Sequence, residues 1–431
     1  MTMEFSVGRA SQKSPVKAYY ALEKPGQKWH IHGYITLIGC YLLMMFYTTV
    51  SGWMLHYFYL TATGKFTGLD SETVSEQFNT MLSQPLVMGF WMVVVVIAGI
   101  LVCSIGLQNG LEKVTKVMMI SLLLIMIVLA VNSFFMDGAK EGLSFYLIPD
   151  FGRMKEIGII KTITGAMNQA FFTLSLGIGA MAIFGSYIGK ERSLLGESLN
   201  IALLDTFVAI TSGLIIFPAC FTFNVDQTSG PGLIFITLPN IFNHIPMGRL
   251  WGSLFFVFMS FAAFSTILAV FENIISFYMD MGGWSRKKAV MLNIVLIILL
   301  SLPAVLGFNL LSGFQPMGAG SSVMDLEDFL VSYNLLPLGS MIFVLFCVKK
   351  NGWGWDNFHK EANEGKGLKI SNKLQFYMTY ILPAIIVVVY LKGYYDTFAK
   401  MGLKVLAGWM AFAVALLAII FILSSLKKKE K

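Results

Sequence analysis

One apolar segment, residues 163–188, contains the run Asn168-Gln169-Ala170-Phe171-Phe172-Thr173-Leu174-Ser175-Leu176-Gly177-Ile178-Gly179. A helix needs about 20 apolar residues to cross a bilayer, and this segment is long enough. Two glycines and two hydroxyl side chains at its middle weaken the helix where neighbouring groups must satisfy the freed backbone. The run therefore predicts either a broken helix that binds ions and substrate or a small-residue face for close helix packing.

Apolar segments of this kind recur along the whole chain. Of its 431 residues, 56% are hydrophobic and 13% are charged, whereas soluble domains are roughly 45–50% apolar and about 25% charged. So little charge cannot cover a water-facing surface, which excludes a soluble globular protein, and the apolar content excludes a disordered chain. Ten helical spans are predicted at roughly 34–60, 87–106, 117–136, 163–188, 197–224, 250–280, 289–308, 329–348, 374–391 and 405–426.

The basic residues predict the orientation, because no Lys or Arg lies inside a predicted span. With a cytoplasmic N-terminus, 22 of the 31 basic residues are cytoplasmic and 9 are outside, as the positive-inside rule requires. We predict one transmembrane domain over residues 1–426 of a multi-pass protein of the cell (inner or plasma) membrane, opened by a cytoplasmic segment at 1–33. A basic tail at 427–431 places the C-terminus in the cytoplasm too. The net charge of +7 thus indicates a lipid bilayer, not nucleic acid, as partner.

Asp205 is the carboxylate at depth in the span 197–224. A carboxylate costs about 2.5–3.5 kcal/mol at a helix centre on insertion scales, and no span offers Lys or Arg as a partner. An ionised Asp205 therefore needs a metal ion or a proton from solution; a hydrogen-bonded structural Asp is the alternative. An intramembrane aspartyl protease needs two facing Asp residues, which argues against an enzyme.

Adjacent hydroxyls, Ser265 and Thr266, follow Ala262 by one turn in the span 250–280. Two hydroxyls and a freed carbonyl suit an oxygen-loving cation such as sodium. Hydroxyls that bond back to their own helix are the alternative for any single Ser or Thr. Tyr47, in the span 34–60, is by itself typical of a packed tyrosine with one satisfied hydroxyl.

The run at 168–179 resembles the unwound sixth helix of the neurotransmitter:sodium symporter family of sodium-coupled amino-acid transporters. Weaker resemblances support it at Gly230–Pro239, Ser285–Lys287 and Asp325–Phe329, and the likeness covers essentially the whole chain. It implies an all-α, inverted-repeat (leucine-transporter-like) fold. It also implies sodium-coupled symport of an amino acid by alternating access.

Residues Met3–Arg9 resemble the end of family helix 2, so the ten spans would be family helices 3 to 12. Helix 1 and most of helix 2 would then be absent, and each sodium site would be incomplete. The resemblance thus implies a possible partner, an N-terminal fragment that supplies helices 1 and 2. The rival hypothesis is a transport-inactive truncated fragment, or one half of a split transporter.

The resemblance also implies positions for the substrate and for two sodium ions. Eight residues would contact the substrate: Leu43, Tyr47, Phe172, Thr173, Ser175, Ile178, Ile267 and Val270. Thr173 and Asp205 would bind the first sodium ion, and Ala262, Ser265 and Thr266 the second. The apolar side chains at 43, 178, 267 and 270 imply a hydrophobic amino acid.

Asp205 stands where most of the family has an Asn. A chloride ion supplies negative charge beside this sodium in chloride-dependent members, so the carboxylate implies that chloride is not required. By position, Asp328 resembles the extracellular gate, Asp280 and Tyr187 resemble the cytoplasmic gate, and Glu4 would brace the unwound helix. Proton-coupled transport, with Asp205 titrating in place of sodium binding, is the other transport hypothesis.

Overall fold

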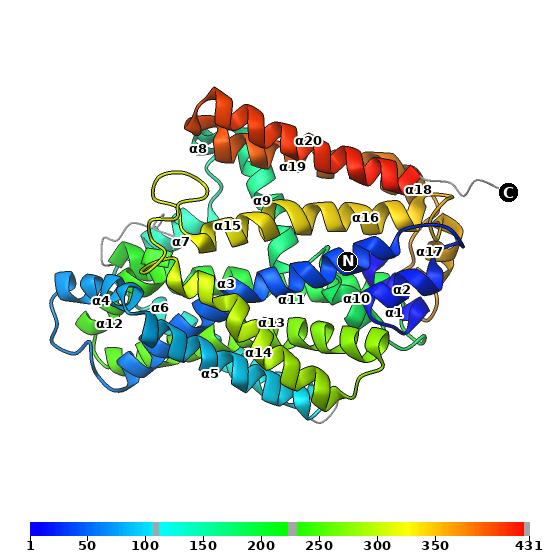
Figure 1. Cartoon of the computed structure of the whole chain (residues 1–431). Helices are drawn as coiled ribbons and strands as arrows, with labels where there is room; N and C mark the ends of the chain where they lie inside the picture. The colour runs from blue at the N-terminus through cyan, green and yellow to red at the C-terminus, as the bar shows by residue number, and fades with distance from the viewer. Residues whose placement is uncertain (107–111, 223–230, 426–431) are drawn as a thin grey trace.

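The chain is described by a computed structural model that covers residues 1–106, 112–222 and 231–425. Gly230 and the basic tail at 427–431 lie outside the described residues. Within them the regular elements are helices, and Arg192 and Lys366 form an isolated β-bridge. The elements are α1 (Thr2–Ser11), α2 (Pro15–Leu22), α3 (His30–Ala62), α4 (Ser71–Ser83), α5 (Pro85–Ser104), α6 (Lys113–Ser133), α7 (Ala139–Leu147), α8 (Phe151–Ile157), α9 (Ile159–Thr173), α10 (Ala180–Gly185), α11 (Leu194–Thr222), the π-helix η2 (Leu233–Thr237), α12 (Leu238–His244), α13 (Gly248–Gly282), α14 (Arg286–Leu306), α15 (Val323–Leu330), the π-helix η3 (Val331–Leu335), α16 (Leu336–Val348), α17 (Trp355–Ala362), α18 (Leu374–Phe376), the π-helix η4 (Tyr377–Ile381), α19 (Leu382–Phe398), the 3-10 helix η5 (Ala399–Met401) and α20 (Leu403–Ser425) (Figure 1).

Nine helical segments in the described ranges are long and apolar enough to cross a membrane. They are His30–Ala62, Pro85–Ser104, Lys113–Ser133, Leu194–Thr222, Gly248–Gly282, Arg286–Leu306, Val323–Val348, Leu374–Met401 and Leu403–Ser425. The sequence predicted ten, and the difference is the segment 163–188, which is divided between α9 and α10.

The helix break predicted for this segment is confirmed, since α9 ends at Thr173 and α10 begins at Ala180. Three residues between them have positive φ angles: 47° at Ser175, 91° at Gly177 and 78° at Gly179. An α-helix cannot continue through such left-handed conformations, which glycine adopts without a steric penalty. The helix therefore stops before Ser175, the first left-handed residue, and the two left-handed glycines keep it from resuming before Ala180.

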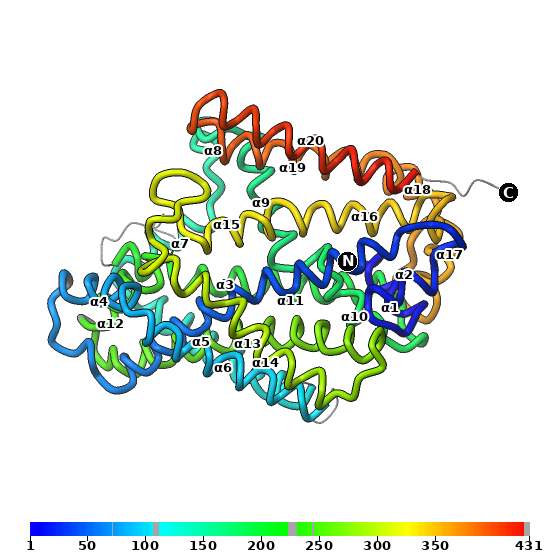
Figure 2. Tube along the Cα trace, in the orientation of Figure 1, coloured from blue at the N-terminus to red at the C-terminus, as the bar shows by residue number. Residues whose placement is uncertain are grey.

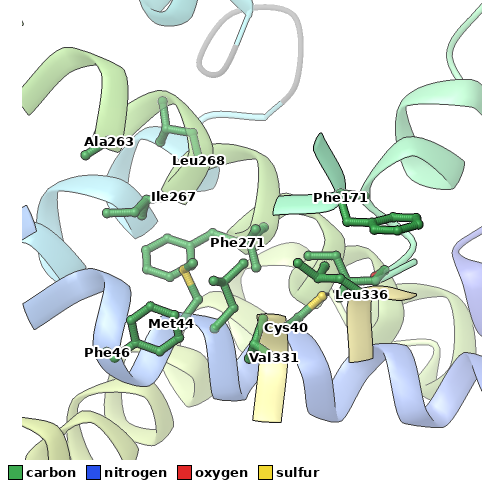
Figure 3. Packing of buried hydrophobic residues seen from close by; sticks show 14 of the residues in the cluster. Cys40, Met44, Phe46, Phe171, Ala263, Ile267, Leu268, Phe271, Val331 and Leu336 are labelled. Carbon is green, nitrogen blue, oxygen red and sulfur yellow. Dashed lines mark hydrogen bonds between the residues drawn. The ribbon is translucent and has the colours of Figure 1, made fainter. Parts of the chain in front are cut away.

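The two longest helices, α3 and α13, pack against each other inside the bundle (Figures 1 and 2). Figure 3 shows Cys40 and Met44 of α3 near Ile267 and Phe271 of α13. All four side chains are fully buried. In contrast, α20 lies at the edge of the bundle, so the core that positions the break is built mainly by α3, α13 and their neighbours.

The N-terminal helix α1, part of the predicted cytoplasmic segment 1–33, is buried against α10 and α17. A Cβ atom on Gly8 would lie 1.8 Å from the carbonyl oxygen of Ala182, so the backbones of α1 and α10 touch. Arg9, whose side chain has no exposed surface, donates from Nε to Oε1 of Glu361 at 2.6 Å. It also donates to the carbonyl of Arg192 at 2.7 Å. These contacts fix α1 beside the broken helix.

Candidate functional site

The freed backbone of the helix break is satisfied by groups from three other helices. The amide of Gly177 donates to Oε1 of Glu4 at 2.7 Å, which confirms the predicted contact of Glu4 with the unwound segment. The carbonyl of Ile178 accepts from Nδ2 of Asn273 at 3.3 Å and from the thiol of Cys40 at 3.6 Å. Buried backbone groups without partners are costly, so these side chains stabilise the break.

The break also contacts the backbone of α16 directly. A Cβ atom on Gly177 would lie 2.2 Å from the carbonyl oxygen of Leu336, and one on Gly339 would lie 2.2 Å from the carbonyl oxygen of Gly177. Only glycine fits at both positions. The contact lies beside η3, a π-helical turn of a kind that often marks functional sites. Two irregular segments of the membrane helices thus meet here.

A cavity of about 450 Å³ opens beside the break, between α3, α6, α9, α11 and α13. Ten of the residues predicted from the resemblance line it: Leu43, Tyr47, Phe172, Thr173, Ser175, Ile178, Asp205, Ala262, Ser265 and Thr266. Gln169, which the sequence analysis did not assign to the site, lines it too. It precedes Thr173 by four residues, so the helical period places both on one face of α9.

Thr173 and Asp205 meet on one side of the cavity. The Thr173 hydroxyl donates to Oδ1 of Asp205 at 2.9 Å, which connects the end of α9 to α11. No Lys, Arg or His within the described ranges forms an ion pair with Asp205, which is half-buried. The hydroxyl keeps its lone pairs, because it acts as the donor in this bond. The pair therefore offers a cation an anionic oxygen and a neutral one.

Ala262, Ser265 and Thr266 contribute oxygens from α13. The Ser265 hydroxyl donates to the carbonyl of Ala262 at 2.8 Å, so it bonds back to its own helix. Its oxygen retains two lone pairs that can bind a cation. The side chains of Tyr47 and Thr266 interact across α3 and α13. This group of oxygens faces the same cavity as Asp205.

Ile267 and Val270 do not line this cavity, although both were predicted to contact the substrate. Their side chains are 0% and 1% exposed, and they belong to the hydrophobic core. Successive side chains point about 100° apart around an α-helix, so Ile267 points away from the face that carries Thr266. A Cβ atom on Gly99 would lie 3.2 Å from Ile267, which shows that this side chain packs against α5.

The three predicted gate residues lie outside the cavity wall. Asp328 accepts from the Ser332 hydroxyl at 2.7 Å within the α15–η3 segment. Asp280, near the end of α13, accepts from the amide of Ser14 at 2.6 Å. Tyr187 follows α10 and is 47% exposed. These positions do not test the gate roles, which stay predictions.

These features define a class of protein. Many apolar helices, one of them broken at mid-span, surround a cavity lined by carboxylate, hydroxyl and carbonyl oxygens. Secondary transporters place their substrate and coupling ions at such broken helices. The chain belongs to the sodium:neurotransmitter symporter family, whose sequence pattern matches residues 76–428.

Individual relatives agree with this assignment. The uncharacterized sodium-dependent transporter YhdH of Bacillus subtilis is 32% identical over 391 residues, which are 90% of this chain and 84% of that protein. An uncharacterized sodium-dependent transporter of Haemophilus influenzae is 29% identical over 373 residues, 85% of this chain and 79% of that protein.

A solved structure shows the same fold. The crystal structure of MhsT in complex with L-phenylalanine matches 90% of this chain and 87% of that chain, with a TM-score of 0.81 and 35% identity. The predicted all-α, inverted-repeat transporter fold is thereby confirmed. The chain is a multi-pass membrane protein of a sodium-dependent transporter family, and not an enzyme.

Proposed function

We propose that this protein couples sodium entry to the uptake of a hydrophobic amino acid by alternating access. One observation carries the proposal: a single cavity brings the oxygens of Thr173 and Asp205 together with those of Ala262, Ser265 and Thr266. Hard cations prefer such oxygen ligands, and Asp205 has no basic partner within the described ranges. The first group would hold one sodium ion and the second group another.

The cavity wall supports a hydrophobic substrate. Leu43, Phe172 and Ile178 offer apolar surface, and the Tyr47 hydroxyl can donate to a substrate carboxylate. A volume of about 450 Å³ suits a small molecule. Ser175 and Thr173 lie at the break, where backbone carbonyls can accept from an ammonium group. The bound L-phenylalanine of the MhsT complex is an amino acid of the same kind.

The charge of Asp205 bears on the ion requirement. A carboxylate beside the first sodium ion supplies the negative charge that a chloride ion would otherwise supply, so we propose coupling that does not need chloride. We further propose that both termini lie in the cytoplasm, because that orientation places most of the basic residues inside.

Coupling requires that the ligands bind the outward and inward states differently. Sodium bound by Thr173 and Asp205 would hold the end of α9 against α11, and sodium at Ser265 and Thr266 would add α13 to the closed site. Asp328 on the outside, with Asp280 and Tyr187 on the inside, would then close the two pathways in turn. The inward sodium gradient gives transport its direction.

Uptake of radiolabelled L-phenylalanine by proteoliposomes tests the proposal. At fixed pH we expect uptake in sodium buffer and none in choline buffer. Uptake that follows a proton gradient in choline buffer would instead establish the proton-coupled alternative. If neither uptake nor sodium-dependent binding occurs, the chain is a transport-inactive fragment or needs family helices 1 and 2 from a separate chain.

A further inference from the structure

A second large groove lies far from the transport cavity, at the end of the molecule where α16, α18 and α20 come together beside α17 (Figure 1). Its volume is about 1370 Å³, and it shares no lining residue with the cavity at the break. The wall that continues along the membrane helices is apolar and includes Leu345 of α16, Val387 and Val388 of α19, and Phe421 of α20. Val388 is 58% exposed, so this surface is open to an apolar ligand.

Three ammonium groups gather at one end of the groove: Lys24, Lys349 and Lys350. None of them forms an ion pair in the part of the chain that the structure describes. Lys24 donates to the carbonyl of Lys350 at 2.6 Å, and Lys349 donates to the Ser424 hydroxyl at 2.7 Å. These neutral oxygens leave the positive charges uncompensated.

Lys349 illustrates the consequence. Burial lowers the pKa of its ammonium group, because a partly desolvated charge without a counter-charge is destabilised. The carboxylate of Asp356 is the acidic group on the described wall of the groove. One carboxylate against three ammonium groups leaves a net positive charge, which an anion would neutralise.

Aromatic residues also line the groove. Trp353 and Trp355 line the groove beside the lysines, and Trp355 donates from Nε1 to Asn372. Tyr380, which is 64% exposed, lines it from η4. Tryptophan and tyrosine favour the headgroup level of a bilayer, and lysine extends its ammonium toward the headgroups. The groove thus combines an apolar wall along the membrane helices with aromatic and basic residues near the ends of those helices.

We propose that this groove is a specific site for an anionic phospholipid. The phosphate group would bind Lys24, Lys349 and Lys350, and an acyl chain would lie along α19 and α20. This combination of surfaces matches an amphiphile with a charged head, and basic pockets between membrane helices bind such headgroups. A free phosphate ion has no apolar body, so it would not use the wall. The site is independent of the proposed transport function.

Native mass spectrometry of the detergent-purified protein tests the site with phosphatidylglycerol, phosphatidylcholine and inorganic phosphate as separate probes. We expect phosphatidylglycerol to be retained, phosphatidylcholine to be retained much less, and phosphate not at all. The double variant Lys24→Gln/Lys350→Gln should lose about 25-fold in phosphatidylglycerol affinity, about fivefold for each lysine. The control Lys113→Gln/Lys116→Gln, which removes two lysines outside the groove, should leave affinity unchanged.

Two further variants separate charge from shape. Asp356→Asn removes the opposing carboxylate and should raise phosphatidylglycerol affinity. Ala384→Trp fills the apolar wall and should reduce retention of the lipid while the lysines stay in place. Equal retention of phosphatidylglycerol and phosphatidylcholine, or an unchanged double variant, would overturn the proposal. Binding of inorganic phosphate as tightly as the lipid would overturn it as well.

Discussion

The Thr173 hydroxyl donates to the Asp205 carboxylate at 2.9 Å, so the last residue of α9 is connected to the middle of α11 at the helix break. The bond holds a neutral oxygen beside a charged one on the wall of the cavity. It also places the carboxylate where the unwound segment begins. The chemistry of this pair leads to the first two predictions.

Replacing Asp205 with Asn should weaken sodium binding. The amide keeps an oxygen that can accept from Thr173 but removes the negative charge. We expect the sodium concentration for half-maximal uptake to rise about tenfold, which corresponds to about 1.4 kcal/mol. Asp150→Asn is the matched control, because Asp150 is exposed and caps α8, and Asn caps a helix equally well. Equal sodium dependence of both variants and the native protein would contradict the first sodium site.

Replacing chloride with gluconate should leave uptake by the native protein unchanged. The Asp205 carboxylate already provides the negative charge that chloride would provide beside the first sodium ion. The measurement is initial uptake at constant sodium concentration and constant pH. Loss of uptake in gluconate would show that Asp205 does not serve this role.

Gly177→Ala should destabilise the protein and abolish transport. The φ angle of 91° alone costs an alanine about 1–3 kcal/mol, and its Cβ atom would lie 2.2 Å from the carbonyl oxygen of Leu336. Gly165→Ala in α9 is the control, because no atom beyond its own turn of helix lies within 4 Å of its Cβ position. An alanine there should stabilise the helix by about 1 kcal/mol or less. Thermal unfolding in detergent compares the two, and similar melting temperatures would be incompatible with the described contact.

Asn273→Ala should impair substrate binding indirectly, because it weakens the support of the helix break. It removes the amide that donates to the carbonyl of Ile178, a bond worth about 1 kcal/mol. We expect the KM for the amino acid to rise about fivefold. Asn309→Ala, which removes an amide that donates to the carbonyls of Leu82 and Val305, is the control. If both variants shift KM equally, Asn273 has only a structural role.

Arg9→Ala should cost much more stability than Arg192→Ala. Arg9 is buried with Glu361, and removal of one partner of a buried ion pair costs about 3–5 kcal/mol. The Arg192 side chain is 68% exposed where it pairs with Glu197, and such surface pairs contribute about 0–1 kcal/mol. Denaturant unfolding of both variants in detergent provides the comparison. Equal losses would show that the Arg9 pair is solvated.

The helix break shows what could be predicted from sequence. Its position follows from local chemistry, because Gly177 and Gly179 permit the positive φ angles that keep the segment after Thr173 unwound. Its support was predicted in part, because the resemblance placed Glu4 at the break. The second contact was not predicted, because Asn273 lies on α13, 95 residues from Ile178 in the chain. No local pattern marks that contact. The membrane class was predictable for a simpler reason, since composition alone excludes a soluble protein.

Some placements depend on packing that the sequence alone does not reveal. The segment Met3–Arg9 has mixed polarity, and it is buried with the guanidinium of Arg9 satisfied by ionic and backbone contacts. Ile267 and Val270 were assigned to the substrate pocket by position in the resemblance. The direction in which α13 presents them depends on its packing against α5 and α3, which sequence position alone does not determine.

Where Gly177 meets Gly339, main chain rests on main chain with no side chain between. Side chains can change rotamer and so absorb a small displacement. Two peptide backbones in van der Waals contact have no such freedom and cannot absorb it. The unwound segment and the start of α16 should therefore move together as a rigid unit. A conformational change that tilts the unwound segment should tilt α16 as well, and the reverse should also hold.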